Sequence, residues 1–188
     1  MNTAVLVPVE EYLRYTGKPY REYREGRVEE KAMPTVLHGL LAWALVTLLR
    51  RAGLAASLEV RVPVGSNKYL IPDVLADAHL PEAYPTKPVL LCCEVLSPED
   101  GLGQMLSKCE EYHAWGVPYC WVVDPVRRSA WQYAKGGEPE KATVALEAGS
   151  VRVSLPELFS ILDEGKQAGD ADAPGATPQP GEPTKKAE

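Results

Sequence analysis

The 188-residue chain has only four cysteines, and no two of them are spaced as Cys-x-x-Cys. Cys92 and Cys93 are adjacent, and adjacent side chains in a strand point to opposite faces, so this pair is poorly placed to bind one metal ion. Cys109 and Cys120 stand alone. We interpret all four as small core residues in a reducing compartment, which argues against a zinc site.

The sequence also lacks a segment that would direct it to a membrane. No apolar run is long enough to span a bilayer. Residues 1–7 contain no basic residue and therefore do not form the charged start of a secretory signal. A cytoplasmic protein without a membrane partner is the expectation.

Positive charge is scarce, since 20 Lys and Arg face 26 Asp and Glu and the formal net charge is −6. This balance argues against a protein that coats nucleic acid regardless of sequence, but not against an enzyme that gathers positive charge locally around an acidic site. The N-terminal segment is locally basic, although Glu22 and Glu25 interrupt it. A phosphate-binding patch and a solvated mixed-charge face both remain open for its cations, Arg14, Lys18, Arg21, Arg24 and Arg27.

The length predicts one domain with a substantial core, and 45% hydrophobic residues are ordinary for a globular protein. From residue 165 the chain becomes rich in Gly, Ala, Asp, Pro and Lys and loses its apolar periodicity. Such a segment buries too little surface to offset the entropy of ordering. We therefore expect a single domain over residues 1–164 and a disordered low-complexity tail over residues 165–188.

The hydrophobic pattern alternates between helical and strand periods. Helices are predicted at Pro8–Tyr15, Thr35–Arg51, with Thr35 as cap and Gly53 as stop, Leu102–Trp115 and briefly from Pro156. Strands are predicted at Arg27–Ala32, Leu58–Val64, Leu70–Ala76, Val89–Leu96, Tyr119–Asp124 and Ala130–Ala134, with weak ones near Ala142 and Val151. This order predicts an α/β fold in which helices flank a mixed central β-sheet.

Two acids and a lysine stand in unexpectedly apolar surroundings. Glu94 interrupts the run Val89–Leu96, Asp73 interrupts the second apolar segment, and Lys108 lies in a predicted helix. A buried carboxylate requires a metal ion or a cation beside it. If the helix after the Glu94 strand begins near Leu102 and doubles back, strand and helix rises allow Lys108 to come level with Glu94. A turn-forming acid and a lysine whose head reaches water are the ordinary alternatives; together the three residues suit metal-assisted hydrolysis.

The ordered motifs resemble the PD-(D/E)XK nuclease superfamily and, within it, the Uma-two family of restriction-endonuclease-like proteins. The resemblance covers about residues 8 to 160. It rests on Pro72-Asp73, Glu94-Val95-Leu96-Ser97-Pro98, Lys108 with Tyr112, Gly116-Val117-Pro118, Trp121 and Asp124-Pro125, together with Glu10-Glu11-Tyr12-Leu13, Glu22 and His38 near the N-terminus.

This resemblance implies a restriction-endonuclease-like core and a metal-dependent endonuclease that hydrolyses nucleic acid, with DNA favoured over RNA. Asp73, Glu94 and the backbone carbonyl of Val95 would bind Mg²⁺, which Mn²⁺ could replace. Lys108 would orient the attacking water and offset charge on the phosphate. The superfamily motif has a lysine two residues after the glutamate, and this position is Leu96 here. In the family resembled, the lysine typically lies on the following helix, at the position of Lys108.

Three further residues are accessory candidates. Glu22 is either a third acid of the site or a surface salt-bridge partner of Arg14 or Arg27. His38, at the start of a helix, either touches a phosphate or, as is more common for a histidine there, is a packing or capping residue. Tyr112, one turn from Lys108, either hydrogen-bonds in the site or is simply core.

Gln104 is also an accessory candidate, and it departs from the pattern. The family resembled commonly has an Asp there, one helical turn before the lysine, and glutamine supports a metal site only weakly. The alternative function is therefore a weakly active or inactive nuclease-fold protein that binds nucleic acid or protein. The sequence leaves open whether the chain forms a homodimer.

Overall fold

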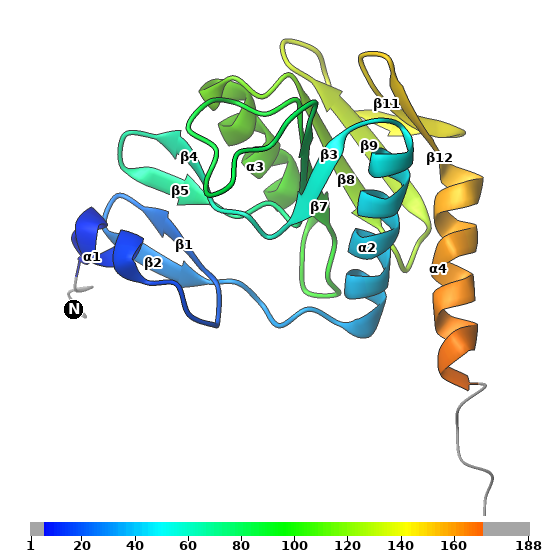
Figure 1. Ribbon diagram of the computed structural model, residues 1–188, viewed down its shortest axis with the longest axis horizontal. Coiled ribbons are helices and arrows are strands. Elements are labelled where there is room, and N and C mark those ends of the chain that lie inside the picture. The colour runs from blue at the N-terminus through cyan, green and yellow to red at the C-terminus, as the bar shows by residue number, and fades with distance from the viewer. Residues whose placement is uncertain (1–5, 171–188) are drawn as a thin grey trace, which may run out of the picture.

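The computed structural model describes residues 6–170, with side chains to residue 165 (Figure 1). The helices are α1 (Val9–Arg14), α2 (Val36–Arg51), α3 (Leu102–Trp115) and α4 (Leu155–Asp170). The strands are β1 (Arg21–Arg24), β2 (Arg27–Glu30), β3 (Ala55–Leu58), β4 (Val62–Gly65), β5 (Lys68–Leu70), β6 (Val74–Asp77), β7 (Leu91–Val95), β8 (Tyr119–Asp124), β9 (Ser129–Ala134), β10 (Glu140–Ala142), β11 (Ala145–Ala148) and β12 (Val151–Ser154).

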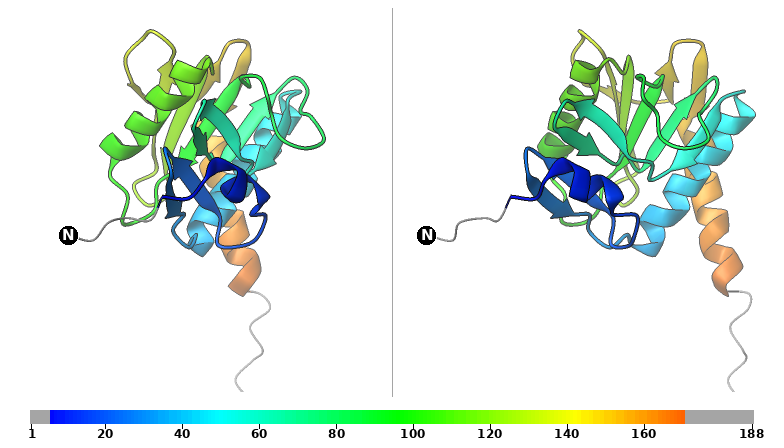
Figure 2. Two further views of the ribbon diagram at one scale, coloured as in Figure 1. Left: turned by 90° about the vertical axis from the view of Figure 1, so that its left-hand side faces the viewer. Right: turned by 60° about the vertical axis from the view of Figure 1, so that its left-hand side comes forward.

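The central element is a six-stranded sheet in the order β10-β9-β8-β7-β6-β3. Strands β7 and β8 pair in parallel, because α3 crosses between them, and the other neighbours are antiparallel. A smaller antiparallel sheet, β2-β1-β5-β4, lies with α1 at the N-terminal side of the molecule (Figure 2). Strands β11 and β12 form a hairpin. The mixed sheet flanked by helices confirms the predicted fold class.

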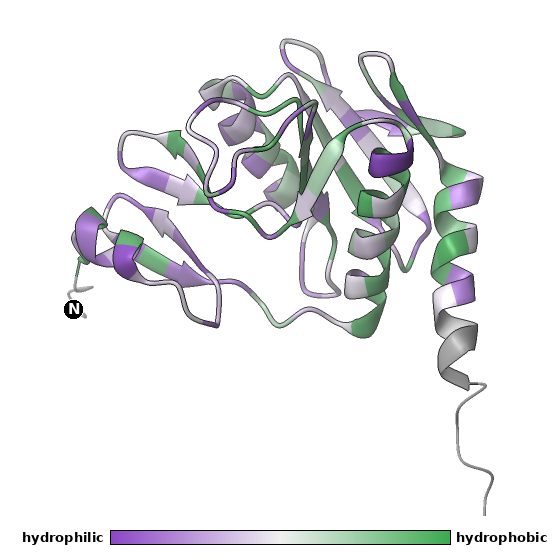
Figure 3. Cartoon of the chain, in the orientation of Figure 1, coloured by the Kyte–Doolittle hydropathy of each residue, from purple (hydrophilic) through white to green (hydrophobic). Residues whose placement is uncertain are grey.

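Alternate residues of the central sheet face two separate cores. Cys93 packs in the core with α2 and α4, which lie side by side on one face (Figure 1). Cys92 packs in the core with α3 on the other face. All four cysteines are buried and unpaired by disulfides, as predicted. In Figure 3, hydrophobic colour follows α2 and the inner strands, whereas α1 and β1 are largely hydrophilic.

Two strands predicted as continuous are each divided between the sheets, so these predictions were wrong. The segment Leu58–Val64 breaks between β3 and β4 at Glu59, whose φ is +51°. The segment Leu70–Ala76 breaks between β5 and β6 around Pro72, which has no N–H to donate to a ladder. At both breaks the chain passes from one sheet to the other, a tertiary event that the apolar pattern does not record.

The N-terminal hairpin holds a strand that the sequence did not indicate. Strand β1 pairs with β2 on one side and β5 on the other, and a tight turn at Glu25-Gly26, with φ of +51° and +91°, joins it to β2. Its residues, Arg-Glu-Tyr-Arg, are too polar to stand out. This strand carries Glu22 and therefore decides where that acid lies.

The helices α2 and α3 have the predicted bounds, and Thr35 caps α2 by accepting a hydrogen bond from the His38 backbone N–H at 3.2 Å. Helix α4 continues to Asp170, past residue 165, where we expected the tail to begin. The rest of that tail, residues 171–188, lies outside the described residues. No helix within residues 6–170 is long and apolar enough to cross a membrane.

Gly116 ends α3 and gives a test of how tightly this helix is joined to the sheet. Its φ is +127°, and a Cβ there would lie 2.7 Å from Pro88 Cγ. Gly116→Ala should lower the free energy of unfolding by about 1–3 kcal/mol in urea titration, because both the backbone and the contact become strained. Gly39→Ala is the control: this α2 position has open space, so alanine should stabilise by about 0.5–1 kcal/mol. Equal effects of both changes would contradict this account.

Candidate active site

A cavity of about 440 Å³ opens between the N-terminal sheet, the ends of β6 and β7, and α3. The carboxyl end of β7 and the start of β6 meet here, because the two strands are antiparallel. Asp73, just before β6, and Glu94, near the end of β7, therefore both line the cleft. Of the eight predicted site residues, seven line it: Glu22, His38, Asp73, Glu94, Val95, Gln104 and Lys108. The eighth, Tyr112, lies directly behind it and contacts Glu94.

Asp73 is held one residue before β6 and directly across from Glu94. The antiparallel register pairs Val74 with Cys93, and one further step places Asp73 opposite Glu94 on the same face. The Asp73 carboxylate accepts a hydrogen bond from the Val95 backbone N–H at 2.8 Å. The carboxylate is only 5% exposed. The predicted pair of acids on neighbouring strands is therefore present.

Glu94 points toward α3, where two side chains meet its carboxylate. Lys108 Nζ lies 3.0 Å from Glu94 Oε1, and the Tyr112 hydroxyl donates to the same oxygen at 2.5 Å. The two α3 residues are one turn apart and so share a helix face. Because both contacts use Oε1, Oε2 is the oxygen that Glu94 can offer to a ligand in the cleft. Tyr112 is both core, being fully buried, and part of the site.

Glu22 is a buried member of the cluster and not a surface salt-bridge residue. Its Oε1 accepts from Lys108 Nζ at 2.9 Å and from the Ile71 backbone N–H at 3.1 Å. Arg24 stands 3.6 Å from its other carboxylate oxygen. Lys108 thus bridges two acids, Glu22 and Glu94, that are far apart in the sequence.

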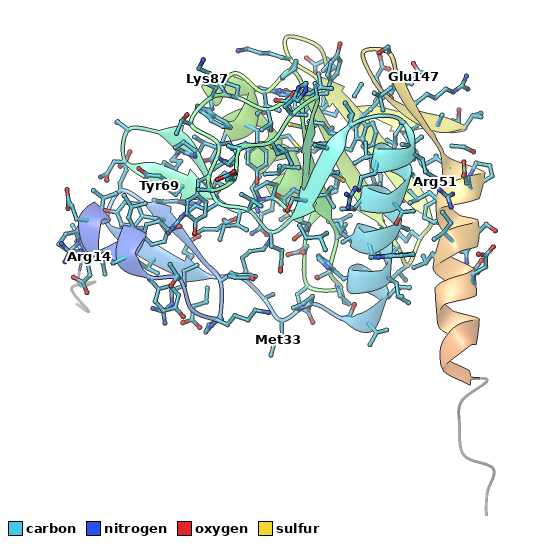
Figure 4. All side chains as sticks on the ribbon, viewed as in Figure 1. Arg14, Met33, Arg51, Tyr69, Lys87 and Glu147 are labelled. Carbon is cyan, nitrogen blue, oxygen red and sulfur yellow. The ribbon has the colours of Figure 1, made fainter. Side chains whose placement is uncertain are left out.

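A second lysine, Lys31, was missed by sequence reasoning. Its Nζ lies 2.7 Å from Asp73 Oδ1 and donates to the Ile71 carbonyl at 2.9 Å. Lys31 directly follows β2, on the connection to α2, while Met33 on the same connection is 90% exposed and projects into solvent (Figure 4). Lys31 follows two glutamates, and this local sequence is typical of a charged strand at the surface. Nothing in it indicated a buried lysine.

His38 also binds Asp73, with Nε2 3.1 Å from Oδ2. The preferred interpretation of this histidine, packing or capping, missed that contact. Its backbone N–H does serve the cap of α2, and that cap fixes the first turn so that the ring reaches the cleft. Lys31 contacts Oδ1 of Asp73, whereas His38 and the Val95 N–H both contact Oδ2, so both carboxylate oxygens are held.

Burial and these contacts push the pKa values of the two acids in opposite directions. Burial acts to raise the pKa of Asp73, but the His38 hydrogen bond and the Lys31 charge outweigh it and hold that pKa well below its usual range. For Glu94 burial prevails over the attraction of Lys108, and the pKa is raised. Burial acts to lower the pKa of Lys108, but the charges of Glu94 and Glu22 raise it by more than burial lowers it. The pKa of Lys108 is therefore above its ordinary value, and the ammonium stays charged.

The mouth of the cleft carries a further ion-pair network. Arg24 pairs with Glu111 of α3, and Lys68 of β5 lies 3.2 Å from the same glutamate. Gln104, also on α3, is exposed and lines the cleft one turn before Lys108. An amide at this position adds no negative charge to those of Glu22, Glu94 and Asp73 that balance Lys108.

The donor set fits a hard divalent cation that keeps most of its waters. Within the part of the chain that the structure describes, no group of three or more His, Cys, Asp or Glu side chains is arranged to hold a metal ion. Mg²⁺ does not require one, because it is commonly bound by one or two carboxylates together with water. Asp73 and Glu94 are the two carboxylates that would hold it. The ammonium groups of Lys31 and Lys108 pair with these two carboxylates.

Comparison with known proteins identifies a family and a similar fold. The Uma2 family model, described as "Putative restriction endonuclease", matches residues 9–163. A crystal structure of "a putative nuclease belonging to DUF820 from Anabaena variabilis" has the same fold, with a TM-score of 0.70 at 21% identity, over 83% of this chain and 99% of that one. No match was found among curated protein sequences.

The opposite pKa shifts of the two acids predict opposite effects on metal-free stability. The lowered pKa of Asp73 means that its carboxylate stabilises the fold above its unfolded pKa, a contribution lost as pH falls through the folded pKa. The raised pKa of Glu94 means that its protonated form favours the fold, an advantage lost as pH rises from 4.5 through the folded pKa. At neutral pH with chelator, Asp73→Asn should cost about 1–3 kcal/mol of unfolding free energy, whereas Glu94→Gln should cost nothing. Equal losses in urea titration would refute this assignment.

Proposed function

The chain belongs to the Uma2 family, and from this membership and the geometry of the cleft we propose that it is a metal-dependent endonuclease. The reaction is hydrolysis of phosphodiester bonds of nucleic acid, with DNA as the favoured substrate. The observation that carries the proposal is the buried pair Asp73 and Glu94, opposite one another across β6 and β7, with Lys108 Nζ 3.0 Å from Glu94.

Asp73, Glu94 and the backbone carbonyl of Val95 are the ligands in this proposal. A Mg²⁺ ion held there, or Mn²⁺ in its place, would supply Lewis acidity to the phosphate and would lower the pKa of its bound water. The clamp of Lys31, His38 and the Val95 N–H fixes the Asp73 carboxylate before any ligand arrives. A fixed carboxylate loses little conformational entropy on binding.

Lys108 is the charge-stabilising group. It projects from the rigid helix α3, its stem is buried, and its raised pKa keeps the ammonium protonated at neutral pH. A positive charge beside the phosphate stabilises the charge that develops during hydrolysis. Glu22 and Tyr112 position this lysine and Glu94 through the hydrogen bonds already described.

Lys108→Met tests the catalytic role. Methionine keeps the apolar stem, so folding should survive, and Mg²⁺ binding measured by calorimetry should survive because the lysine is not a ligand. Cleavage of a DNA substrate should fall by on the order of 10²-fold or more. Lys141→Met, at an exposed lysine of β10, is the matched control and should cleave like the parent. Unchanged cleavage by Lys108→Met would mean that any activity comes from another site. Asp73→Asn should lose Mg²⁺ binding if Asp73 is a ligand.

Gln104 gives a specific reason to consider the second function, a weakly active nuclease-fold protein that binds nucleic acid. An amide at the cleft wall adds no negative charge beside Lys108 or a metal ion. Gln104→Asp should then tighten Mg²⁺ binding severalfold and raise cleavage, because a carboxylate attracts both cations. A strong parent activity that Gln104→Asp leaves unchanged or lowers would remove the argument for the weaker function.

A further inference from the structure

A second concave site, which we call the tyrosine groove, adjoins the cleft. It has a volume of about 60 Å³ and is built where the loop after α1, the β3–β4 connection and the β6–β7 loop meet. Figure 2 shows α1 and the loop that follows it on the outer side of the N-terminal sheet. Four tyrosines and two arginines line the groove: Tyr12, Tyr15, Tyr20, Tyr84, Arg21 and Arg61.

Each cation of the groove lies over an aromatic ring. The Arg61 guanidinium is 5.0 Å from the ring centre of Tyr12 and 4.8 Å from that of Tyr84. The Arg21 guanidinium is 4.2 Å from the Tyr15 ring centre. Beside the groove, Lys18 Nζ is 5.2 Å from the Tyr20 ring centre. Alternating aromatic rings and cations are the surface on which nucleobases stack and phosphates bind.

The groove is built in advance of any ligand. Its floor is Tyr12, which is buried, stacks on Tyr23 at 4.8 Å between ring centres, and donates its hydroxyl to the Arg21 carbonyl at 2.8 Å. The Tyr15 hydroxyl donates to the Pro19 carbonyl at 3.2 Å and so holds the loop closed. Tyr84, by contrast, is 48% exposed and offers a free part of its ring to solvent.

The charge of the groove is positive in a chain that is acidic overall. Arg21 and Arg61 in the lining and Lys18 beside it carry three positive charges, against Glu59 in the wall and Glu30, which pairs with Arg21 at 2.9 Å, so the excess is one positive charge. Such a local excess of positive charge attracts a phosphate backbone, while the acidic cleft itself does not. The groove therefore carries a small local excess of positive charge in a chain whose net charge is −6.

The groove and the cleft are joined through two shared residues. Glu59 lines both. Ile71 lines the groove, while its backbone N–H donates to Glu22 and its carbonyl accepts from Lys31 in the cleft. Ile71 is two residues from Asp73, so the Cα atoms of these two residues lie at most roughly 7 Å apart. A strand whose phosphodiester sits in the cleft can therefore place an adjacent nucleotide in the groove.

We propose that the tyrosine groove binds an unpaired nucleotide of the substrate strand, with its base on Tyr84 and its phosphate on Arg61, Arg21 or Lys18. The inference rests on the proposed function and narrows its substrate to nucleic acid with a single-stranded segment. Bases in an intact duplex are stacked on one another and do not present their faces to a tyrosine.

The test is fluorescence anisotropy of a short labelled single-stranded oligonucleotide, with chelator present so that no cleavage occurs. Tyr84→Leu should weaken binding by roughly tenfold, as expected for loss of one stacked base. Lys18→Gln, at an exposed position, should weaken it severalfold and reduce its salt dependence. The matched controls are Trp43→Leu, an aromatic 57% exposed on α2, and Lys141→Gln, and both should bind like the parent.

Intact duplex of the same sequence should bind more weakly than the single strand and should be indifferent to Tyr84→Leu. Ribose and deoxyribose strands of one sequence distinguish RNA from DNA, and tight Tyr84-dependent binding of either supports the groove. Parent and Tyr84→Leu binding the strand equally, no binding by the parent, or a preference for duplex would each overturn it. Melting temperatures equal to that of the parent exclude misfolding of the variants.

A small diester, bis(p-nitrophenyl) phosphate, separates this inference from the catalytic proposal, because it has no base and requires only the cleft. If neither parent nor Tyr84→Leu hydrolyses it while the oligonucleotide affinities differ as expected, the groove stands and the nuclease proposal fails. If both hydrolyse it equally and their oligonucleotide affinities are also equal, the nuclease proposal stands and the groove fails.

Discussion

The antiparallel pairing of β6 with β7 is the constraint on which the cleft depends. It sets Asp73 opposite Glu94 at the end of a sheet that is buried on both faces, where two carboxylates would repel each other in a medium of low dielectric. The molecule compensates with two lysines from different parts of the chain: Lys31 contacts Asp73, and Lys108 contacts Glu94. The N-terminal sheet and α3 are placed where they deliver these charges.

The two acids consequently have different electrostatic roles. The Asp73 carboxylate interacts with a histidine, a lysine and a backbone amide. These interactions hold it ionised. Glu94 lies deeper, and burial outweighs the attraction of its lysine. An arrangement in which one carboxylate is fixed and charged while the other gains from an added positive charge would suit the cation of the proposed site. The interactions that stabilise the metal-free fold are thus also those that prepare the proposed site.

The N-terminal segment connects the cleft with the surface around it. Strand β1 places Glu22 inside the cleft and Arg24 at its mouth, while the preceding loop forms the tyrosine groove. The basic residues of this segment left two alternatives open in the sequence, a phosphate-binding patch or a mixed-charge face. The structure divides them: Arg24 is engaged with the acids Glu22 and Glu111, and Arg21 lies beside Tyr15, where the proposed nucleotide would bind.

The sequence by itself determined the fold class, the bounds of α2 and α3, and the trio Asp73, Glu94 and Lys108, because buried charges in apolar runs and helical spacing are local signals. Only the tertiary structure decided how the long apolar segments divide between two sheets, since chain breaks at Glu59 and Pro72 depend on which sheet receives each half. It alone also recruited residues such as Lys31 to the cleft, because contacts between distant segments leave no periodic trace in the sequence.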